Sequence, residues 1–361
     1  TIFSNGEICI SHINIQAEPS TVSFCMETRK IQLSGGTTYT VSLPKSWAQE
    51  HGVEPGSVVS LHPNGDGSML LDIIEDGDTE DLTTVIDVTT TNPEAFDDQL
   101  FALYTVGFDS IVLRDRNGHS PDQQRVIESA IDGLSGFEML EVADNRIKLV
   151  NLVDAENIDV RKSALRLRLV ALSMHRDSIT AIANDDEELA ERVISRDNEA
   201  DKLFSMVTRH FRRSLSDLRE TKKLGHSREQ LFEYYYICRQ FERVADHAVK
   251  MVMLGVEADV DIPAALVEHL REHSGRSRRI IDDSADVVLG GADIKMAHEA
   301  LSACEQLLTD LDTVERDLYD YGQSDAAYTT GLLLDSIRRS AKYGANVAEM
   351  GIQRVLRKEM E

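Results

Sequence analysis

Two pairs of acidic residues have the type and spacing needed to bind a metal ion. Asp197 and Asp201 are four residues apart, and so are Glu242 and Asp246. On an α-helix, residues at this spacing lie on the same face. Two such helices packed side by side would bring four carboxylates together, and their mutual repulsion favours a hard, oxygen-seeking cation among them. The pattern therefore predicts a site formed by Asp197, Asp201, Glu242 and Asp246 for a divalent or trivalent ion such as Fe, Mn, Mg or Zn.

A solvated acidic surface is the alternative interpretation of these pairs. Of the 361 residues, 63 are acidic, so chance alone produces about eleven acidic pairs at this spacing, most of them on exposed helix faces. Apolar residues at helical spacing around the second pair favour a position beside a packed seam: Ile237, Phe241, Val244, Ala248 and Met251. Both interpretations remain open at this stage.

Two histidines also lie close to acidic residues along the chain. They are His175 and His247. An exposed histidine paired with a carboxylate is a more common arrangement than a metal ligand, so we expect surface histidines here.

The composition indicates an acidic, globular protein of more than one domain. Hydrophobic residues make up 42% of the chain, and the net charge of −25 is spread over its whole length. Such a surface is typical of a salt-rich, halophilic cytoplasm, and it disfavours indiscriminate binding to nucleic acids or anionic membranes. No apolar run approaches the roughly 18 residues that span a bilayer, so we expect a cytoplasmic protein without membrane insertion. The four cysteines show no metal-binding spacing and are expected to be free thiols.

The N-terminal part predicts two short hairpins around a helix. Residues 1–25 lack a clear pattern and are expected to be a disordered extension or an upstream misassigned start, and we assign them no function. In residues 26–80, Gly35-Gly36 forms the first turn, Leu43-Pro44-Lys45-Ser46-Trp47 begins a helix, and residues 64–67 form the second turn. So short a segment cannot easily build its own core, so two chains are expected to interleave their hairpins.

This module resembles the AbrB-like swapped-hairpin family. The resemblance covers Arg29 to Ile73 and rests on a strand, a Gly turn, a second strand, the Leu-Pro-Lys-x-Trp string and a Pro-Gly before the second hairpin. It implies a homodimer that binds promoter DNA. The candidate DNA-binding residues, which supply positive charge or a hydroxyl group, are Arg29, Lys30, Thr38 and Lys45. A module that serves only for dimerisation is the alternative.

Residues 82–155 alternate between strand and helix patterns and predict a small α/β domain. The segment has no Gly-rich phosphate loop and no nucleophile paired with a base, so we expect a spacer or an interaction module.

The remaining residues predict six long helices with short connections. Their expected bounds are 159–184, 187–219, 227–255, 263–289, 293–321 and 325–358. They divide into two similar three-helix bundles, residues 159–256 and 262–358. When the third helices of the two bundles are overlaid, Arg338 and Lys342 take the places of Glu242 and Asp246. Because two cations cannot bind a divalent ion, a second metal cluster is not expected.

The acidic pairs on the second and third helices resemble those of the PhoU family of phosphate-uptake regulators, over roughly residues 159–358. The resemblance implies metal-binding acidic motifs, contact with components of a phosphate ABC transporter, and negative regulation of phosphate transport and phosphate signalling. An AbrB-like module ahead of PhoU repeats is similar to archaeal members. The predicted fold is thus a multidomain α+β protein: an AbrB-like β-hairpin module, a small α/β domain, and tandem three-helix bundles of the PhoU type.

Two other functions were weighed against this one. A DNA-binding transcription regulator whose helical half senses a different ligand remains the alternative. A carboxylate-bridged metal enzyme would need Glu-x-x-His motifs on facing helices, and the second and third helices of the first bundle lack them. We therefore expect a regulator without catalytic turnover.

Overall fold

The computed structural model describes residues 28–63, 67–73, 81–89, 91, 96–256, 260–321 and 324–360. These residues fall into two compact units, one ending at Asp81 and one beginning at Leu82. The predicted extension at 1–25 and most of the second predicted turn lie outside the described residues.

The first unit consists of two hairpins and a helix, as predicted. Strands β1 (Gln32–Ser34) and β2 (Thr38–Thr40) pair antiparallel, and β3 (Val59–Pro63) pairs in the same way with β4 (Met69–Ile73). Gly35 and Gly36 form the first turn with φ of 62° and 78°, a region in which only glycine is free of strain. Helix α1 (Lys45–Glu50) follows Pro44.

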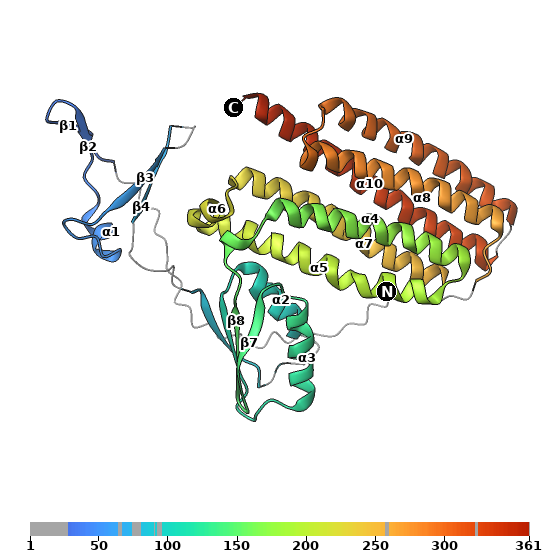
Figure 1. The fold of residues 1–361 in the computed structure, drawn as a ribbon, viewed down its shortest axis with the longest axis horizontal. Helices are drawn as coiled ribbons and strands as arrows, with labels where there is room; N and C mark the ends of the chain where they lie inside the picture. Colours follow the sequence, from blue (N-terminus) through green and yellow to red (C-terminus); the bar gives the residue numbers. More distant parts are fainter. Residues whose placement is uncertain are drawn as a thin grey trace. The chain divides into compact units, whose positions relative to one another are not determined.

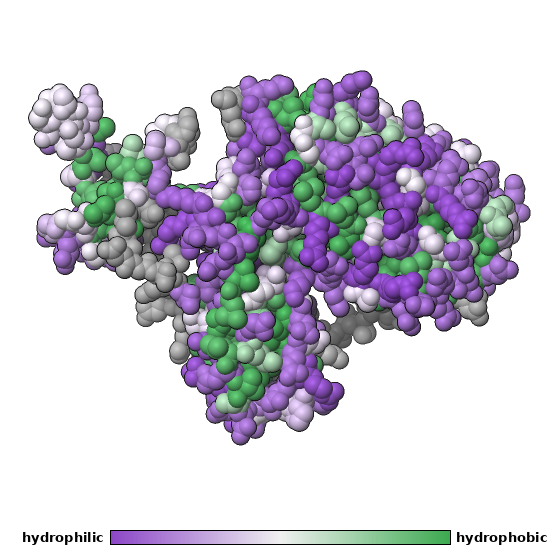
Figure 2. Space-filling model, viewed as in Figure 1, coloured by the Kyte–Doolittle hydropathy of each residue, from purple (hydrophilic) through white to green (hydrophobic). Residues whose placement is uncertain are grey.

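The described residues of this unit form no buried core of their own. Among its residues whose side chains the structure describes, none is buried. Its large apolar side chains are exposed instead (Figure 2): Ile31, Leu33, Tyr39, Val41, Leu43, Val58, Leu61 and Met69. So much exposed apolar surface in so short a segment is typical of an interaction surface.

The α/β domain is built on a four-stranded mixed sheet with the order β5-β6-β8-β7. Strand β5 (Thr83–Asp87) runs parallel to β6 (Ser110–Arg114), and helix α2 (Phe96–Val106) lies between them in the chain. Strands β7 (Phe137–Ala143) and β8 (Arg146–Asn151) form a hairpin whose second strand is antiparallel to β6. Helix α3 (Pro121–Asp132) begins at a capping box between Ser120 and Gln123.

Six long helices form the rest of the described chain (Figure 1). The first half contains α4 (Val160–Asn184), α5 (Glu187–Ser216) and α7 (Arg228–Gly255), and the second contains α8 (Ala264–Ala285), α9 (Ile294–Asp317) and α10 (Asp325–Met360). The side chains of Asp159, Asp186, Ser227 and Asp293 cap the first turns of four of them. None of the helices in the described residues combines the length and the apolar character needed to cross a bilayer.

Three predicted helices change conformation close to their expected C-terminal ends, where a cap, a π-turn and a 3₁₀ turn lie. The second helix stops at Ser216, and Asp217 caps a separate helix, α6 (Leu218–Leu224). The fourth helix passes at Asp286–Gly290 into a π-turn that Gly291 ends with a φ of 76°. The fifth ends in a 3₁₀ turn, Leu318–Tyr321.

The two halves of the helical region share one continuous apolar core. Helix α7 packs against α10, and α4 packs against α8. Buried Glu233 of α7 accepts hydrogen bonds from Arg354 and Arg357 of α10. Within the second half, Gly351 lets α10 pack closely against the turn at Asp286–Gly290, because a Cβ there would lie 2.8 Å from a methyl group of Val287. The tandem bundles therefore form a single packed body.

Helix α5 also carries the contact with the α/β domain. The side chain of Arg209 is 2% exposed and donates to the carbonyl oxygens of Tyr104 (2.8 Å) and Phe108 (2.7 Å). It also donates to the Asp109 carboxylate at 2.7 Å, and Lys202 donates to the carbonyl oxygen of Asp132 at 3.0 Å. The domain predicted to be a spacer is thus fixed to the helix that bears Asp197 and Asp201.

Candidate metal centre

The predicted carboxylates project from two helices that pack against each other. Asp197 and Asp201 lie one turn apart on α5, and Glu242 and Asp246 lie one turn apart on α7. The apolar faces that join these helices are buried and include Ala200 and Phe204 on α5 and Phe241, Val244 and Ala245 on α7. Packing of these faces places the neighbouring acidic positions along the edge of the seam.

Three of the four carboxylates converge on one spot. One oxygen from each of Asp201, Glu242 and Asp246 lies within 4.8 Å of the other two. Asp197 lies outside this group of three, although the charges of Asp201 and Asp246 act on it. The structure therefore brings together three of the predicted ligands and places the fourth on the adjoining turn of α5.

The carboxylates lack partners on their buried sides. Asp197 Oδ1 and Glu242 Oε2 are buried and have no hydrogen-bond partner in the described part of the chain. Burial, and then the charge of Asp201, raises the pKa of Asp197 to about 6. Burial, and then the charge of Asp246, raises the pKa of Glu242 to about 7. These two oxygens therefore lack the polar partners that buried carboxylate oxygens normally have.

Two arginines provide partial compensation. Arg239 donates to Glu242 Oε1 at 3.1 Å, and its positive charge opposes the rise in pKa of Asp201, Glu242 and Asp246. The charge of Arg243 also opposes the rise in pKa of Glu242 and Asp246. Two cations beside four carboxylates leave excess negative charge, and the oxygen-only donor set suits a hard metal ion.

In the second half, Arg338 takes the place of Glu242 in the overlay of the third helices, and it forms ion pairs within the protein. Arg338 of α10 pairs with Asp312 at 2.8 Å and with Glu315 at 2.9 Å, both on α9. Asp335, which lies near this position in sequence, pairs with Arg339 at 2.9 Å. The cations expected from the overlay of the two halves are therefore present, and Arg338 is bound to carboxylates of the facing helix.

The expectation of a surface position is wrong for His175. Its side chain is 0% exposed, because α8 packs over this part of α4. Its Nδ1 lies 3.2 Å from the hydroxyl of Ser274, and its Nε2 has no partner in the described residues. Burial, and then the charge of Arg278, lowers its pKa to about 3. His247 is partly buried against Tyr343, with the ring centroids 5.8 Å apart.

A second group that could hold a metal was not predicted. His269, Glu272 and His273 lie on one face of α8 with ligand atoms within 4.8 Å of one another. His273 is 4% exposed, and neither of its ring nitrogens has a partner in the described residues. The spacing His-x-x-Glu-His is visible in the sequence and could have identified this group, because residues three and four apart share a helix face.

The candidate DNA-binding residues all lie in the first unit and are exposed. Arg29 and Lys30 precede β1, Thr38 begins β2 opposite Ser34, and Lys45 begins α1. They are therefore accessible to a ligand.

Comparison with known proteins finds two matching families. The PhoU domain family matches residues 164–254, a range that includes all four predicted carboxylates. The family described as antidote-toxin recognition MazE, bacterial antitoxin, matches residues 32–74. Among solved structures, the crystal structure of PhoU from Pseudomonas aeruginosa matches with 18% identity and a TM-score of 0.46, over 56% of this chain and 98% of that chain. No curated protein matches significantly.

The two family matches support the two resemblances drawn from the sequence, each over part of the chain. The PhoU domain match ends at residue 254, before the second half begins. The MazE match coincides with the two hairpins of the first unit.

Proposed function

We propose that this protein is a phosphate-uptake regulator, a non-enzymatic protein that lowers phosphate transport and phosphate-responsive signalling when phosphate is plentiful. The observation that carries the proposal is the convergence of Asp201, Glu242 and Asp246 within the region that matches the PhoU domain. Components of a phosphate ABC transporter are the expected partners, in a salt-rich cytoplasm.

A metal ion bound by Asp197, Asp201, Glu242 and Asp246 would complete this site. The unpartnered oxygens of Asp197 and Glu242 fit such a ligand, because a cation would compensate both the repulsion and the missing hydrogen bonds. Fe, Mn, Mg and Zn are the candidates. The absence of imidazole and thiolate from the group favours the harder ions among them.

Elemental analysis of the purified full-length protein tests this site. We expect bound metal in the natural protein and its loss in the Asp197→Ala/Glu242→Ala double variant. A His269→Ala/His273→Ala variant is the control, because it removes the histidine group on α8 and leaves the carboxylates intact. Metal content that is unchanged in the carboxylate variant would contradict the proposed centre.

The first unit is proposed to form a homodimer by exchanging hairpins. Its exposed apolar residues, among them Leu33, Tyr39 and Leu61, would be buried by a second copy. Sedimentation analysis should give a dimer for the natural chain and a monomer for Leu61→Asp. A natural chain that remains monomeric at micromolar concentration would exclude this role.

Promoter DNA is the proposed ligand of the dimer, through Arg29, Lys30, Thr38 and Lys45. The dimer doubles these residues and forms a local cationic surface on an otherwise acidic protein. Fluorescence anisotropy with DNA from a phosphate-transport promoter should show binding that weakens with salt. Lys45→Ala should weaken DNA binding severalfold. Lys358→Ala, in the last turn of α10, should leave the affinity unchanged. Equal affinity in the three proteins would exclude these contacts.

Regulation itself can be tested in cells. Deletion of the gene should raise phosphate uptake in phosphate-rich medium, and the Asp197→Ala/Glu242→Ala variant should fail to restore repression. If that variant restores repression fully, the carboxylates are not needed for regulation.

A further inference from the structure

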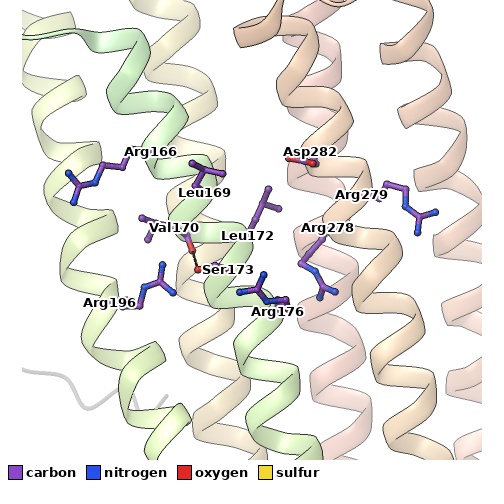
Figure 3. Close-up of a pocket in the computed structure, with 10 residues that line it drawn as sticks. All are labelled: Arg166, Leu169, Val170, Leu172, Ser173, Arg176, Arg196, Arg278, Arg279 and Asp282. Atoms are coloured by element: carbon purple, nitrogen blue, oxygen red, sulfur yellow. Dashed lines mark hydrogen bonds between the residues drawn. The ribbon is translucent and has the colours of Figure 1, made fainter.

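A groove with an unusual concentration of arginine lies on the helical body (Figure 3). It has a volume of about 640 Å³, within the range of small-molecule sites. Helices α4, α5 and α8 line it with Arg166, Leu169, Val170, Leu172, Ser173, Arg176, Arg196, Arg278, Arg279 and Asp282.

The groove is cationic on a protein of net charge −25. Five of its lining residues are arginines and one is a carboxylate, Asp282. Asp282 is already bound by Arg168, whose Nε lies 2.8 Å from Asp282 Oδ1. The lining therefore carries excess positive charge where the rest of the surface is acidic.

Three of the arginines lie side by side along the groove. Figure 3 shows the guanidinium groups of Arg176 and Arg196 pointing toward each other and that of Arg278 beside Arg176. Arg166 and Arg279 point outward, and Arg166 pairs with Glu199 at 2.8 Å.

The protein neutralises these three arginines incompletely. Asp177 is the carboxylate nearest to two of them, 3.1 Å from Arg176 Nε and 3.5 Å from Arg196 Nη1. Arg278 forms no ion pair with any carboxylate in the described ranges. Burial, and then the charge of Arg176, lowers the pKa of Arg278, so the cations lie close enough to repel each other. An anion in the groove would relieve this repulsion.

Arg278 is held in place from behind by buried polar groups. Its Nη1 donates to the Ser274 hydroxyl at 2.6 Å, and that hydroxyl lies 3.2 Å from Nδ1 of buried His175. A guanidinium has five N–H groups, so one is used for positioning and the others remain for a ligand. This arrangement also explains why a histidine and a serine are buried between α4 and α8.

The floor of the groove is apolar. Leu169 is 66% exposed there, an unusual position for a leucine in a well-packed helical body. Val170 and Leu172 lie beside it on α4. The groove therefore offers a cationic end and an apolar surface in one site.

We propose that this groove binds the phosphoryl groups of a small phosphate-containing ligand through Arg176, Arg196 and Arg278. Guanidinium groups match phosphate oxygens with paired, charge-assisted hydrogen bonds, and these three line one groove. Inorganic phosphate, pyrophosphate and a nucleotide share this chemistry, and only a nucleotide would also use the apolar floor. The proposal does not depend on the metal centre or on the proposed regulatory function.

Isothermal titration calorimetry of the full-length protein with phosphate, pyrophosphate and ATP tests the site and separates the sources. We expect saturable binding of at least one of them that weakens with increasing salt. Binding of phosphate alone assigns a phosphate sensor, and tighter binding of ATP assigns a nucleotide site. Absence of saturable binding of all three at millimolar concentration would overturn the proposal.

Two substitutions on α8 make the test specific. Arg278→Gln and Arg271→Gln remove the same charge, but Arg278 lines the groove whereas Arg271 is exposed and is not among the lining residues. Arg278→Gln should lower the affinity at least about tenfold, whereas Arg271→Gln should change it less than about twofold. Circular dichroism verifies that both variants fold. Equal losses in the two variants would mean that general charge, not this groove, attracts the anion, and would overturn the site.

Discussion

The two halves of the helical body solve the same electrostatic problem in different ways. In the first half, carboxylates from α5 and α7 converge with Arg239 as a partial counter-ion. At the corresponding place in the second half, Arg338 of α10 binds Asp312 and Glu315 of α9. One pair of neighbouring helices thus carries an internal ion pair, and the other carries a carboxylate cluster that an external cation would compensate.

The largest expected effect is the gain in stability when a metal ion is added, which we attribute to the carboxylates of the first half. A divalent ion at one hundred times its dissociation constant should stabilise the natural protein by about 2.7 kcal/mol. The Asp197→Ala/Glu242→Ala variant should gain much less, because the remaining carboxylates are too few to bind the ion tightly. Thermal unfolding after chelator treatment, with and without Mn²⁺ or Mg²⁺, measures both. Equal stabilisation of the two proteins would place the ion elsewhere.

Neutralising the arginine of the second half should destabilise the protein. Arg338→Gln leaves Asp312 and Glu315 without their partner, and the Arg338 side chain is only 16% exposed. We expect a loss of about 2 kcal/mol in the free energy of unfolding, measured by chemical denaturation without metal. If the loss is negligible, the second half does not depend on its internal ion pair.

Stability of the metal-free protein should fall as the pH rises from about 4.5 to about 7. The pKa of Asp197 is raised from 3.8 to about 6 and that of Glu242 from 4.5 to about 7. Over this window the folded state keeps protons that the unfolded chain has released, so a higher pH favours unfolding. After allowance for solvent screening, the loss amounts to about 1.5 kcal/mol.

Urea unfolding at several pH values, in high salt and with chelator present, measures this dependence. Asp197→Asn/Glu242→Gln should flatten it, because these side chains no longer titrate. An equal slope in the natural protein and the variant would show that other groups cause the pH dependence.

The smallest loss in the free energy of unfolding is expected when an exposed ion pair on α10 is removed. Arg339 and Asp335 are one helical turn apart on α10 and their side chains are 55% and 38% exposed. Arg339→Gln should cost only about 0.3 kcal/mol, and it serves as the charge-matched control for Arg338→Gln. A loss as large as that of Arg338→Gln would mean that net charge, not burial, governs the difference between the halves.

Much of the fold could be predicted from local patterns. The spacing of apolar residues predicted the long helices to within a few residues at most ends. The pairs Asp197/Asp201 and Glu242/Asp246 were predicted to share helix faces, and three of these four side chains do converge. The ends at Ser216 and Ala285 were missed, because one cap and one π-turn outweigh a continuous apolar period.

The amino-acid sequence determined the local chemistry of this protein: which helices form, which residues share a face, and that the second half carries cations where the first carries carboxylates. These features depend on residues a few positions apart, so spacing reveals them. Other features depend on how α4, α5 and α8 pack. They are the burial of His175 against Ser274 and the position of Arg176, Arg196 and Arg278 along one groove. Those residues are up to about a hundred positions apart in the chain, and no local period records the angle and offset at which helices meet.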